Sequence, residues 1–245
     1  MSREYKMRSL FISMIIAVIF TATIFMHGCK TNMSEYEPPA NNEDGIIKLP
    51  APKLDGDVSV ERALHERRSI REYADDPMTL KEISQICWAA QGITDKARSL
   101  KSAPSAGALY PLEVYVVTGS ITELSQGVYR YLPEEHGLVR ITDGDIRNEL
   151  SVAGLSQSSI LKAPVSLVFS AFYKKTTQKY GERGIRYVHI EAGHASQNVY
   201  LQAVSLGLGT VAIGAFNESE VRELLEMSAD EQPLYIMPIG KLASK

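Results

Sequence analysis

The sequence predicts an α+β fold, with a mixed, mainly antiparallel central sheet flanked by helices and one long central helix. Two short apolar runs, Leu112–Thr118 and Val165–Phe172, have the length and β-branched content of buried strands. Gly127–Tyr131 and Leu138–Thr142 flank a Pro-Glu-Glu-His-Gly turn and predict a hairpin. A helical pattern from about Gly184 to Leu206 is much longer than any other.

The long helix carries two adjacent apolar stripes. One contains Ile190, Gly193, Gln197, Tyr200 and Val204, and the other contains Ala192, Ala195, Val199, Ala203 and Leu206. Together they form an apolar face that is wider than a surface helix needs. We therefore expect a central buried helix, and one small domain is too small to cover both stripes. Gly207 is expected to end it.

The remaining elements follow from shorter patterns. Thr79 and Glu82 form a capping box for a helix that buries Leu80, Ile83, Cys87 and Ala90. Further helices are predicted over Val58–Arg67 and Asp145–Val152 and after Asn217, and further strands over Thr210–Phe216 and Leu234–Ile239.

Residues 1–28 are predicted to be a signal or anchor segment. Basic residues precede a long apolar run that ends at His27-Gly28-Cys29, as in an export signal. A cysteine after a glycine at this place resembles a bacterial lipobox, in which Cys29 is lipidated, although His27 departs from that pattern. The alternative is an uncleaved transmembrane anchor. Both place the chain at a membrane, on the exported side or in the periplasm.

Residues 29–57 are polar and rich in Pro and Asn, which predicts a flexible tether, and residues 58–245 form one globular domain. Without residues 1–28 the chain carries 23 Lys and Arg against 28 Asp and Glu, a net charge of −5. This balance gives no basic face for nucleic acid. The chain has two cysteines, Cys29 and Cys87, which are too few for a cysteine-based metal site.

Three motifs could carry chemistry, and each also has a structural explanation. Arg67-Arg68-Ser69-Ile70-Arg71 could clamp a phosphate, or could simply complement a helix dipole. The small-residue loop from Ser102 to Pro111 could approach a flat ligand, or be a turn before a strand. The segment from Gly207 to Phe216 could line a ligand, or be a helix stop and a core strand.

In this order, with Glu191-Ala192-Gly193-His194-Ala195-Ser196-Gln197-Asn198 between the last two, these motifs resemble the nitroreductase family. The resemblance covers about Val58 to Lys241 and is closest to the branch of the azoline-oxidising (SagB-type) dehydrogenases. It implies a nitroreductase-like fold, an FMN cofactor and a homodimer with the long helix at its interface.

The resemblance also implies roles for individual residues. Arg67, Arg68, Ser69 and Arg71 match the motif that holds the FMN phosphate and ribityl chain, and Lys241 lies where the family often places a phosphate-contacting base. Gly209, Thr210, Val211 and Ala212 match the segment along the flavin ring. Pro104, Ser105, Ala106 and Gly107 match the loop that reaches the ring from the second subunit. This loop lacks the commoner Asn and Gln, which puts simple nitroarene reduction in doubt.

Two histidines lie within the predicted long helix, and a segment rich in tyrosine and basic residues precedes it. His189 and His194 are five residues apart, about 140° around a helix, so they cannot share a metal from it. His194 is expected in the core or at the dimer interface. The segment from Tyr173 to Tyr187 is either a substrate mouth or a solvated connection.

The resemblance implies an FMN-dependent oxidoreductase that moves hydride or electrons from a reduced donor, NAD(P)H or a membrane redox partner, to a small acceptor. No catalytic side chain is predicted, since the cofactor carries the chemistry. The alternative is a flavin-binding or inactive carrier lipoprotein, because nicotinamide donors are scarce outside the cytoplasm.

Overall fold

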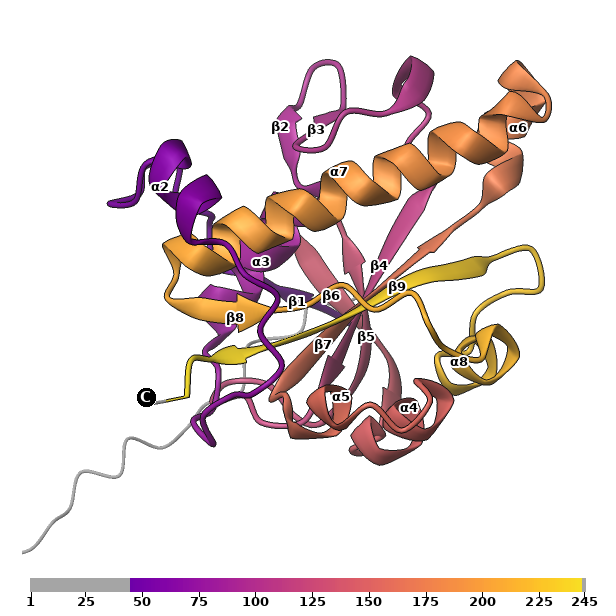
Figure 1. The fold of residues 1–245 in the computed structure, drawn as a ribbon. Helices are drawn as coiled ribbons and strands as arrows, with labels where there is room; N and C mark the ends of the chain where they lie inside the picture. The colour runs from indigo at the N-terminus through magenta and orange to yellow at the C-terminus, as the bar shows by residue number, and fades with distance from the viewer. Residues whose placement is uncertain (1–44, 244–245) are drawn as a thin grey trace, which may run out of the picture. The chain divides into compact units, whose positions relative to one another are not determined.

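A computed structural model describes residues 45–243. The signal or anchor segment, Cys29 and most of the tether lie outside the described residues. Figure 1 shows a central sheet with the long helix α7 (Arg183–Ser205) lying across one face. The seven strands have the order β1-β6-β5-β4-β7-β9-β8, and every neighbouring pair in the described part is antiparallel. The expected fold class is confirmed.

The strands of this sheet are β1 (Ile46–Lys48), β4 (Leu112–Thr118), β5 (Gly127–Leu132), β6 (Gly137–Asp143), β7 (Val165–Ala171), β8 (Leu208–Thr210) and β9 (Gln232–Lys241). A separate small ribbon consists of β2 (Ile93–Asp95) and β3 (Leu100–Lys101). The other helices are α2 (Val60–Glu66), α3 (Leu80–Gln91), α4 (Arg147–Ala153), α5 (Ser158–Lys162), α6 (Tyr173–Tyr180), α8 (Glu218–Leu224) and the 3₁₀ turn η1 (Ala106–Ala108).

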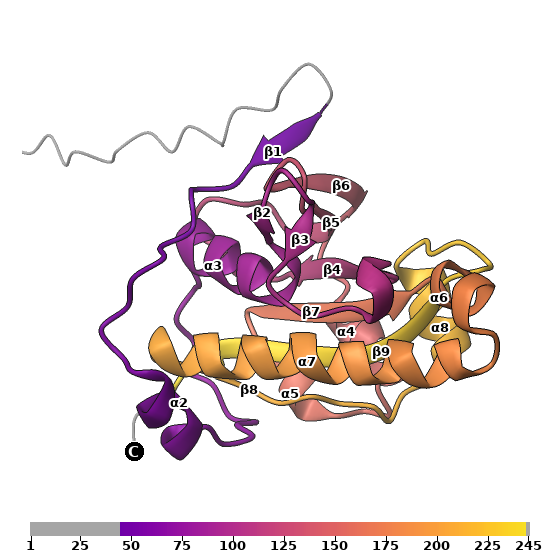
Figure 2. The same cartoon turned by 90° about the horizontal axis from the view of Figure 1, so that it is seen from above.

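Two apolar cores lie on the two faces of the sheet, because β4 is apolar at every second position on both sides. Val114 and Val116 face the core beneath α3 and α7, while Tyr115 and Val117 face the core beneath α4, α5 and α8. Figure 2 shows α3 and α7 together on the first face. A strand that is apolar on both faces belongs in the middle of a sheet, and β4 lies at its centre.

The predicted helix boundaries agree closely with the structure. Thr79 caps α3, with its hydroxyl accepting from Glu82 N and its own N–H donating to the Glu82 carboxylate at 2.7 Å. Asn217 accepts from two N–H groups in the first turn of α8. Gly207 ends α7 with a φ of +70°, a conformation that glycine adopts without strain.

Two predictions about the elements are wrong. The strand expected over Thr210–Phe216 ends at Thr210, because Pro238 on β9 has no N–H to extend the ladder and Ala212 N donates to the Tyr200 hydroxyl instead. The predicted tether, residues 29–57, also extends too far along the chain. β1 pairs with β6, and Ile47 and Leu49 are buried, so the globular domain begins before residue 58.

The two apolar stripes of α7 differ in how far a single chain buries them. Ala192, Ala195, Val199 and Ala203 are buried against the sheet, whereas Ile190 is 47% exposed. The stripe that begins at Ile190 is thus only partly covered by the described residues, since its other members are half-buried. His194 is exposed, so the expectation of a core position for it is wrong.

One acidic side chain lies on the inner side of α7. Glu191 is 2% exposed, and one of its carboxylate oxygens has no hydrogen-bond partner. Its carboxyl group is hydrogen-bonded to the Ser105 side chain. Burial raises the pKa of Glu191 to about 7, against the weaker opposing effects of Ser105, Lys101 and Lys175. This carboxyl group ties α7 to the loop that begins at Pro104.

Replacing Glu191 with Gln should stabilise the protein at high pH. Between its ordinary pKa of 4.5 and the folded value of about 7, the folded chain binds more protons than the unfolded chain, so Glu191 costs stability as pH rises. Allowing for solvent screening, we expect Glu191→Gln to raise the free energy of unfolding by about 2 kcal/mol at about pH 8 and by little at about pH 4.5. Denaturant titrations at one protein concentration measure this. Glu223→Gln, on an exposed position of α8, is the control, and an equal effect of Glu191→Gln at both pH values would contradict the assignment.

Candidate functional site

The segment Arg67–Arg71 follows α2 and is attached to the edge of the sheet. Ile70 N donates to the Thr210 carbonyl at 2.9 Å, and Ser69 and Thr210 form an isolated bridge. A few residues later, Ala74 N donates to the Lys241 carbonyl at 3.0 Å. Two of the predicted groups, the arginine cluster and the segment that begins at Gly209, are therefore neighbours in space, and Lys241 lies on the adjoining strand.

Close packing holds this junction together. A Cβ atom on Gly209 would lie 2.6 Å from the Ile70 side chain, which is closer than real Cβ atoms approach, and 3.0 Å from Leu242, which is a tight contact. The Tyr73 hydroxyl donates to the carbonyls of Ile70 and Pro238, at 2.9 and 3.1 Å. Glycine at position 209 thus allows the arginine segment to lie directly against β8.

Tyr200 joins α7 to both segments, and the sequence analysis did not assign it to the site. Its hydroxyl lies 3.1 Å from Ser69 Oγ and accepts from Ala212 N at 2.8 Å, while the Arg67 guanidinium lies 5.2 Å from the centre of its ring. The sequence did contain a signal for this residue, because Tyr200 is the one aromatic side chain in its stripe of α7. A stripe position is usually assigned to packing, and the hydroxyl was overlooked for that reason.

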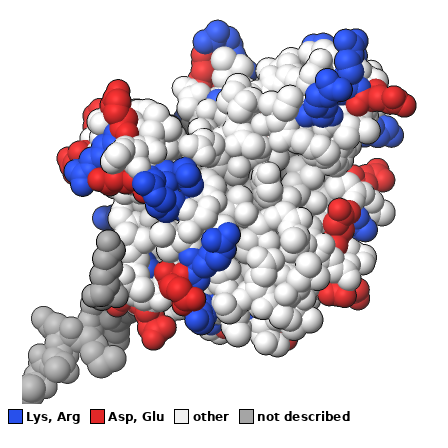
Figure 3. Space-filling view, in the orientation of Figure 1, with Lys and Arg blue, Asp and Glu red and all other residues white. Residues whose placement is uncertain are grey.

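Some cations in the described part of the chain form ion pairs, and others, including those at this junction, do not. Arg62, Arg98, Arg140 and Arg147 each form an ion pair with an acidic side chain. Within residues 45–243, the cations in the cluster have no such partner: Arg67, Arg68, Arg71 and Lys241. Figure 3 shows basic side chains beside α2 and a largely uncharged surface along α7. Positive charge without an internal counter-ion is the donor set that a phosphate dianion requires.

The loop Pro104–Gly107 lies elsewhere in the chain, near α6. A Cβ atom on Gly107 would lie 2.6 Å from the Tyr180 hydroxyl and 2.9 Å from Lys179 Nζ. Glu191, which contacts Ser105, precedes Tyr200 by nine residues on α7, about 14 Å along the helix axis. One chain therefore does not bring this loop to the arginine segment.

The same loop has an unusual backbone. Gly107, Ala108 and Tyr110 have φ values of +65°, +53° and +46°, and two of these residues are not glycine. Tyr110 N donates to Ser105 Oγ at 2.9 Å, and Lys101 N donates to the Tyr110 hydroxyl at 3.1 Å. Such conformations persist only where the surroundings hold them, and they concentrate at functional sites.

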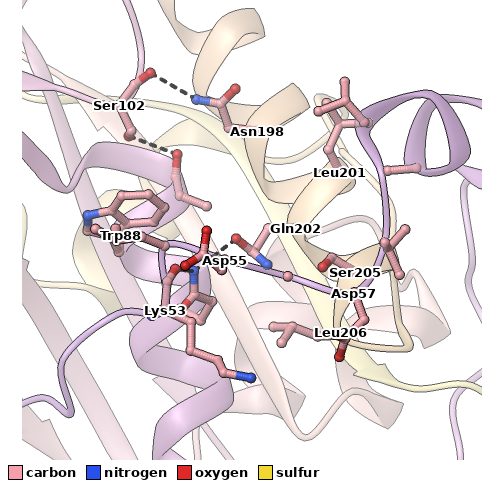
Figure 4. A pocket seen from close by; sticks show the side chains of 17 residues that line it. Lys53, Asp55, Asp57, Trp88, Ser102, Asn198, Leu201, Gln202, Ser205 and Leu206 are labelled. Carbon is pink, nitrogen blue, oxygen red and sulfur yellow. Dashed lines mark hydrogen bonds between the residues drawn. The ribbon is translucent and has the colours of Figure 1, made fainter.

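Two cavities adjoin α7. One, of about 660 Å³, lies at the far end of the segment that continues from Ala212, where it is lined by Gly214 and Phe216 and by Tyr173 and His189. The segment from Tyr173 to Tyr187, expected to be a substrate mouth or a solvated connection, forms α6 and the beginning of α7. Its first residue, Tyr173, lines this cavity. The other, of about 380 Å³, lies between residues 53–60, α3 and α7 (Figure 4), and its lining includes none of the predicted flavin residues.

Residues 45–243 provide no metal site, no reactive cysteine and no membrane-spanning helix. No group of three or more His, Cys, Asp or Glu in this range could hold a metal ion. Cys87 is fully buried, and burial raises the pKa of its thiol, so it is a poor nucleophile. No helix of the described part is both long enough and apolar enough to span a membrane.

Comparison with known proteins agrees with this geometry. The model of the nitroreductase family matches residues 64–241. A protein of Methanocaldococcus jannaschii named as a nitroreductase, MJ1384, is 50% identical over 185 residues, which span 76% of this chain and 92% of the relative. The microcin B17-processing protein McbC of Escherichia coli is 26% identical over 61% of this chain and 57% of its own length.

Two further matches extend the comparison. The FMN reductase [NAD(P)H] of Bacillus subtilis is 28% identical over 74% of this chain and 63% of its own length. A crystal structure described as that of a nitroreductase from Ralstonia eutropha superposes with a TM-score of 0.72 at 29% identity, covering 85% of this chain and 95% of the other. With the family model covering most of the chain, and a relative of 50% identity matched over nearly its whole length, this protein is a member of the nitroreductase family.

Proposed function

We propose that this protein binds FMN at the junction of the arginine segment, β8 and α7, and works as an FMN-dependent oxidoreductase. The observation that carries the proposal is the attachment of the arginine segment to the glycine-packed edge of β8, beside the Ser69 and Tyr200 hydroxyls. The cations of this junction form no ion pair in the described part, although the Arg68 guanidinium donates to the His65 and Arg67 carbonyls at the end of α2. Arg67, Arg68, Arg71 and Lys241 would hold the phosphate, and Ser69 and Tyr200 the ribityl chain. Gly209, Thr210, Val211 and Ala212 would lie along the ring.

The residues present fit this cofactor. The Ser69 and Tyr200 hydroxyls are 3.1 Å apart beside the cations, which suits a polyol attached to a phosphate. Beyond Thr210 the chain leaves the sheet, and the backbone groups that Tyr200, Ile236 and Gln157 do not bond are available to a ligand. When bound, FMN supplies reversible two-electron chemistry, and the protein binds it, orients it and excludes water.

The donor would be NAD(P)H or a membrane redox partner, and the acceptor a small molecule. Support for a nicotinamide donor comes from the FMN reductase of Bacillus subtilis, whose name specifies NAD(P)H. The loop Pro104–Gly107 lacks the Asn and Gln that are common in the family, which favours the azoline-oxidising branch. The similarity to the microcin B17-processing protein McbC supports a relation to enzymes that process peptides.

A homodimer would complete the site. The arginine segment and the Pro104–Gly107 loop contact separate parts of α7, so a second chain could supply the loop that the first chain keeps at a distance. Apolar side chains on α2 and α7 also lack cover: Val60, Leu64, Ile185 and Ile190 are 64%, 54%, 44% and 47% exposed. Soluble chains rarely leave such a surface in water.

The flavin prediction is tested with the purified full-length chain. It should be yellow and should release FMN, not FAD, on denaturation. Arg71→Ala should weaken FMN binding at least about tenfold, because a charge-assisted hydrogen bond contributes about 1.5–3 kcal/mol. Arg62→Ala is the matched control, since Arg62 is exposed on nearby α2 but is paired with Glu66 at 2.8 Å. A colourless protein that FMN cannot load would refute the cofactor assignment.

The shared site is tested by mixing two defective subunits. Arg71→Ala damages the phosphate clamp, and Ala106→Trp blocks the loop without forcing a side chain onto Gly107, whose φ is +65°. In a heterodimer one of the two sites receives both intact halves, so half of the wild-type flavin content should return. Absorbance of isolated heterodimers measures it. No recovery in proven heterodimers would mean that each site is built within one chain.

Membrane attachment is a separate proposal, and residue 29 lies outside the described part. Cys29→Ser should abolish incorporation of a labelled fatty acid and leave the signal uncleaved. Mass spectrometry of the intact protein reports both changes. A mature wild-type chain that begins at Met1 and carries no acyl group would instead support an uncleaved anchor.

A further inference from the structure

The connection between β1 and α2 lies outside the part of the chain that matches the nitroreductase family model, which begins at residue 64. We call this segment, Leu49–Ser59, the strap. Figure 2 shows it running past α3 to α2. It contains no helix or strand, so bonds from its backbone to side chains of the domain must hold it in place. It also forms one wall of each of two cavities that Trp88 lines.

Two neighbouring side chains of α3 bind the strap by its backbone. Gln85 is 8% exposed, and its amide oxygen accepts from Lys53 N at 2.8 Å while its amide nitrogen donates to the Lys53 carbonyl at 3.1 Å. Ser84 donates from its hydroxyl to the Pro50 carbonyl. An amide and a hydroxyl do not change charge between pH 5 and 8, so these two contacts are insensitive to pH in that range.

The third contact comes from a side chain that does titrate in that range, His136 in the turn between β5 and β6. Its Nε2 atom lies 3.0 Å from the Pro50 carbonyl oxygen and 2.8 Å from Ser84 Oγ, and its Nδ1 atom lies 2.9 Å from the Tyr131 hydroxyl. A carbonyl oxygen can only accept, so the proton of the neutral ring is on Nε2. Nδ1 is then an acceptor, and Tyr131 donates to it.

A second proton on this ring would place two donors opposite each other. Nδ1 would become an N–H group facing the Tyr131 hydroxyl, which would have to turn and lose its acceptor. Tyr131 is 1% exposed, and within residues 45–243 its hydroxyl has no other hydrogen-bond partner. A hydrogen bond lost at a buried site is poorly replaced by water. The neutral ring therefore fits the closed strap, and the charged ring does not.

The surroundings of His136 also oppose a positive charge. Burial is the main cause that lowers its pKa; the Pro50 carbonyl acts against this effect, and Lys48 on β1 adds to it. Glu135, in the same turn, is paired with Lys48 at 2.7 Å and offers little charge to a protonated ring. In the described part, the other ionisable groups beside the histidine, its tyrosine partner or the adjoining cavity are a phenol, an acid, a base and a buried thiol: Tyr131, Glu134, Lys96 and Cys87.

We propose that His136 is a pH-sensitive switch for the strap: the neutral ring holds this segment against α3, and protonation releases it and opens both cavities beside Trp88. In the open state His136 has its ordinary pKa of 6.5, whereas in the closed state its pKa is lower. The open state therefore binds more protons at acidic pH, so closure is strongest above pH 6.5 and weakens as the pH falls below that value.

The first test measures hydrogen exchange of the Lys53 backbone N–H in the full-length chain at about pH 7.5 and 5.5. Its protection factor, which is corrected for the direct effect of pH on exchange, reports how often the strap opens. Because opening takes up one proton, protection should fall by up to about tenfold between these values. The reference is Leu150 N–H, which donates to the Ile146 carbonyl at 2.8 Å on α4 and should keep its protection. An equal fall at Leu150 would mean that the whole domain opens, which would overturn the proposal.

Three variants test the assignment to His136. His136→Gln keeps an amide that can donate to the Pro50 carbonyl but cannot be protonated, so Lys53 protection at the two pH values should agree within about twofold. Tyr131→Phe removes the donor that opposes a charged ring, and the fall should shrink to about threefold, the effect of one hydrogen bond. His65→Gln, at an exposed position of α2, is the matched control and should respond as wild type does.

Trp88 provides a second measurement, because it is the one tryptophan of the chain and lines both cavities. Quenching of its fluorescence by acrylamide should increase on acidification in wild type and stay constant in His136→Gln. If His136→Gln does not fold, Tyr131→Phe carries the test with both measurements. The proposal is wrong if wild type shows the same Lys53 protection and the same quenching at both pH values, or if a variant at 136 responds as wild type does. Neither measurement depends on a cofactor or on turnover.

Discussion

The hydrogen bond from Ile70 N–H to the Thr210 carbonyl is the contact on which the proposed site depends. It attaches the arginine segment to β8, the last strand at one edge of the sheet, at the point where the chain leaves that sheet. Without it, the segment after α2 would be an exposed connection with mobile cations. With it, the backbone that carries the arginines is positioned by a strand whose own place is set by pairing with β9. A glycine at 209 is the local condition for this attachment.

Much of the fold was predictable because its elements have strong local signals. β4 and β7 are apolar runs of strand length, and Thr79, Asn217 and Gly207 mark helix ends through chemistry that acts within a few residues. β1 was missed because three residues in a polar segment give almost no periodic signal, and it is stabilised by β6, about ninety residues away. The end of β8 was missed for a related reason, since it depends on Pro238 and Tyr200, which lie far along the chain.

In the candidate site, too, the features with local signals were predictable and those that depend on long-range contacts were not. Its candidate residues were visible in the sequence as three motifs in a typical order, although each motif alone also had a structural explanation. Its geometry depends on contacts between distant segments, so the contacts of Tyr200 with Ser69 and Ala212, and the hydrogen bond between Tyr173 and His189, become visible only in three dimensions. Basic residues therefore lie near the Thr210 end of this segment, and Glu218, the first residue of α8, follows its other end at Phe216.

The two edges of the sheet have a consequence for copies of this protein that meet at high concentration. The edge strands β1 and β8 each contain three residues, while the interior strands have six to ten. An edge this short offers few unpaired backbone groups to a neighbouring molecule. Crowded copies would therefore have little opportunity to extend one another's sheets, and contacts between them would fall to the side-chain surfaces of α2 and α7.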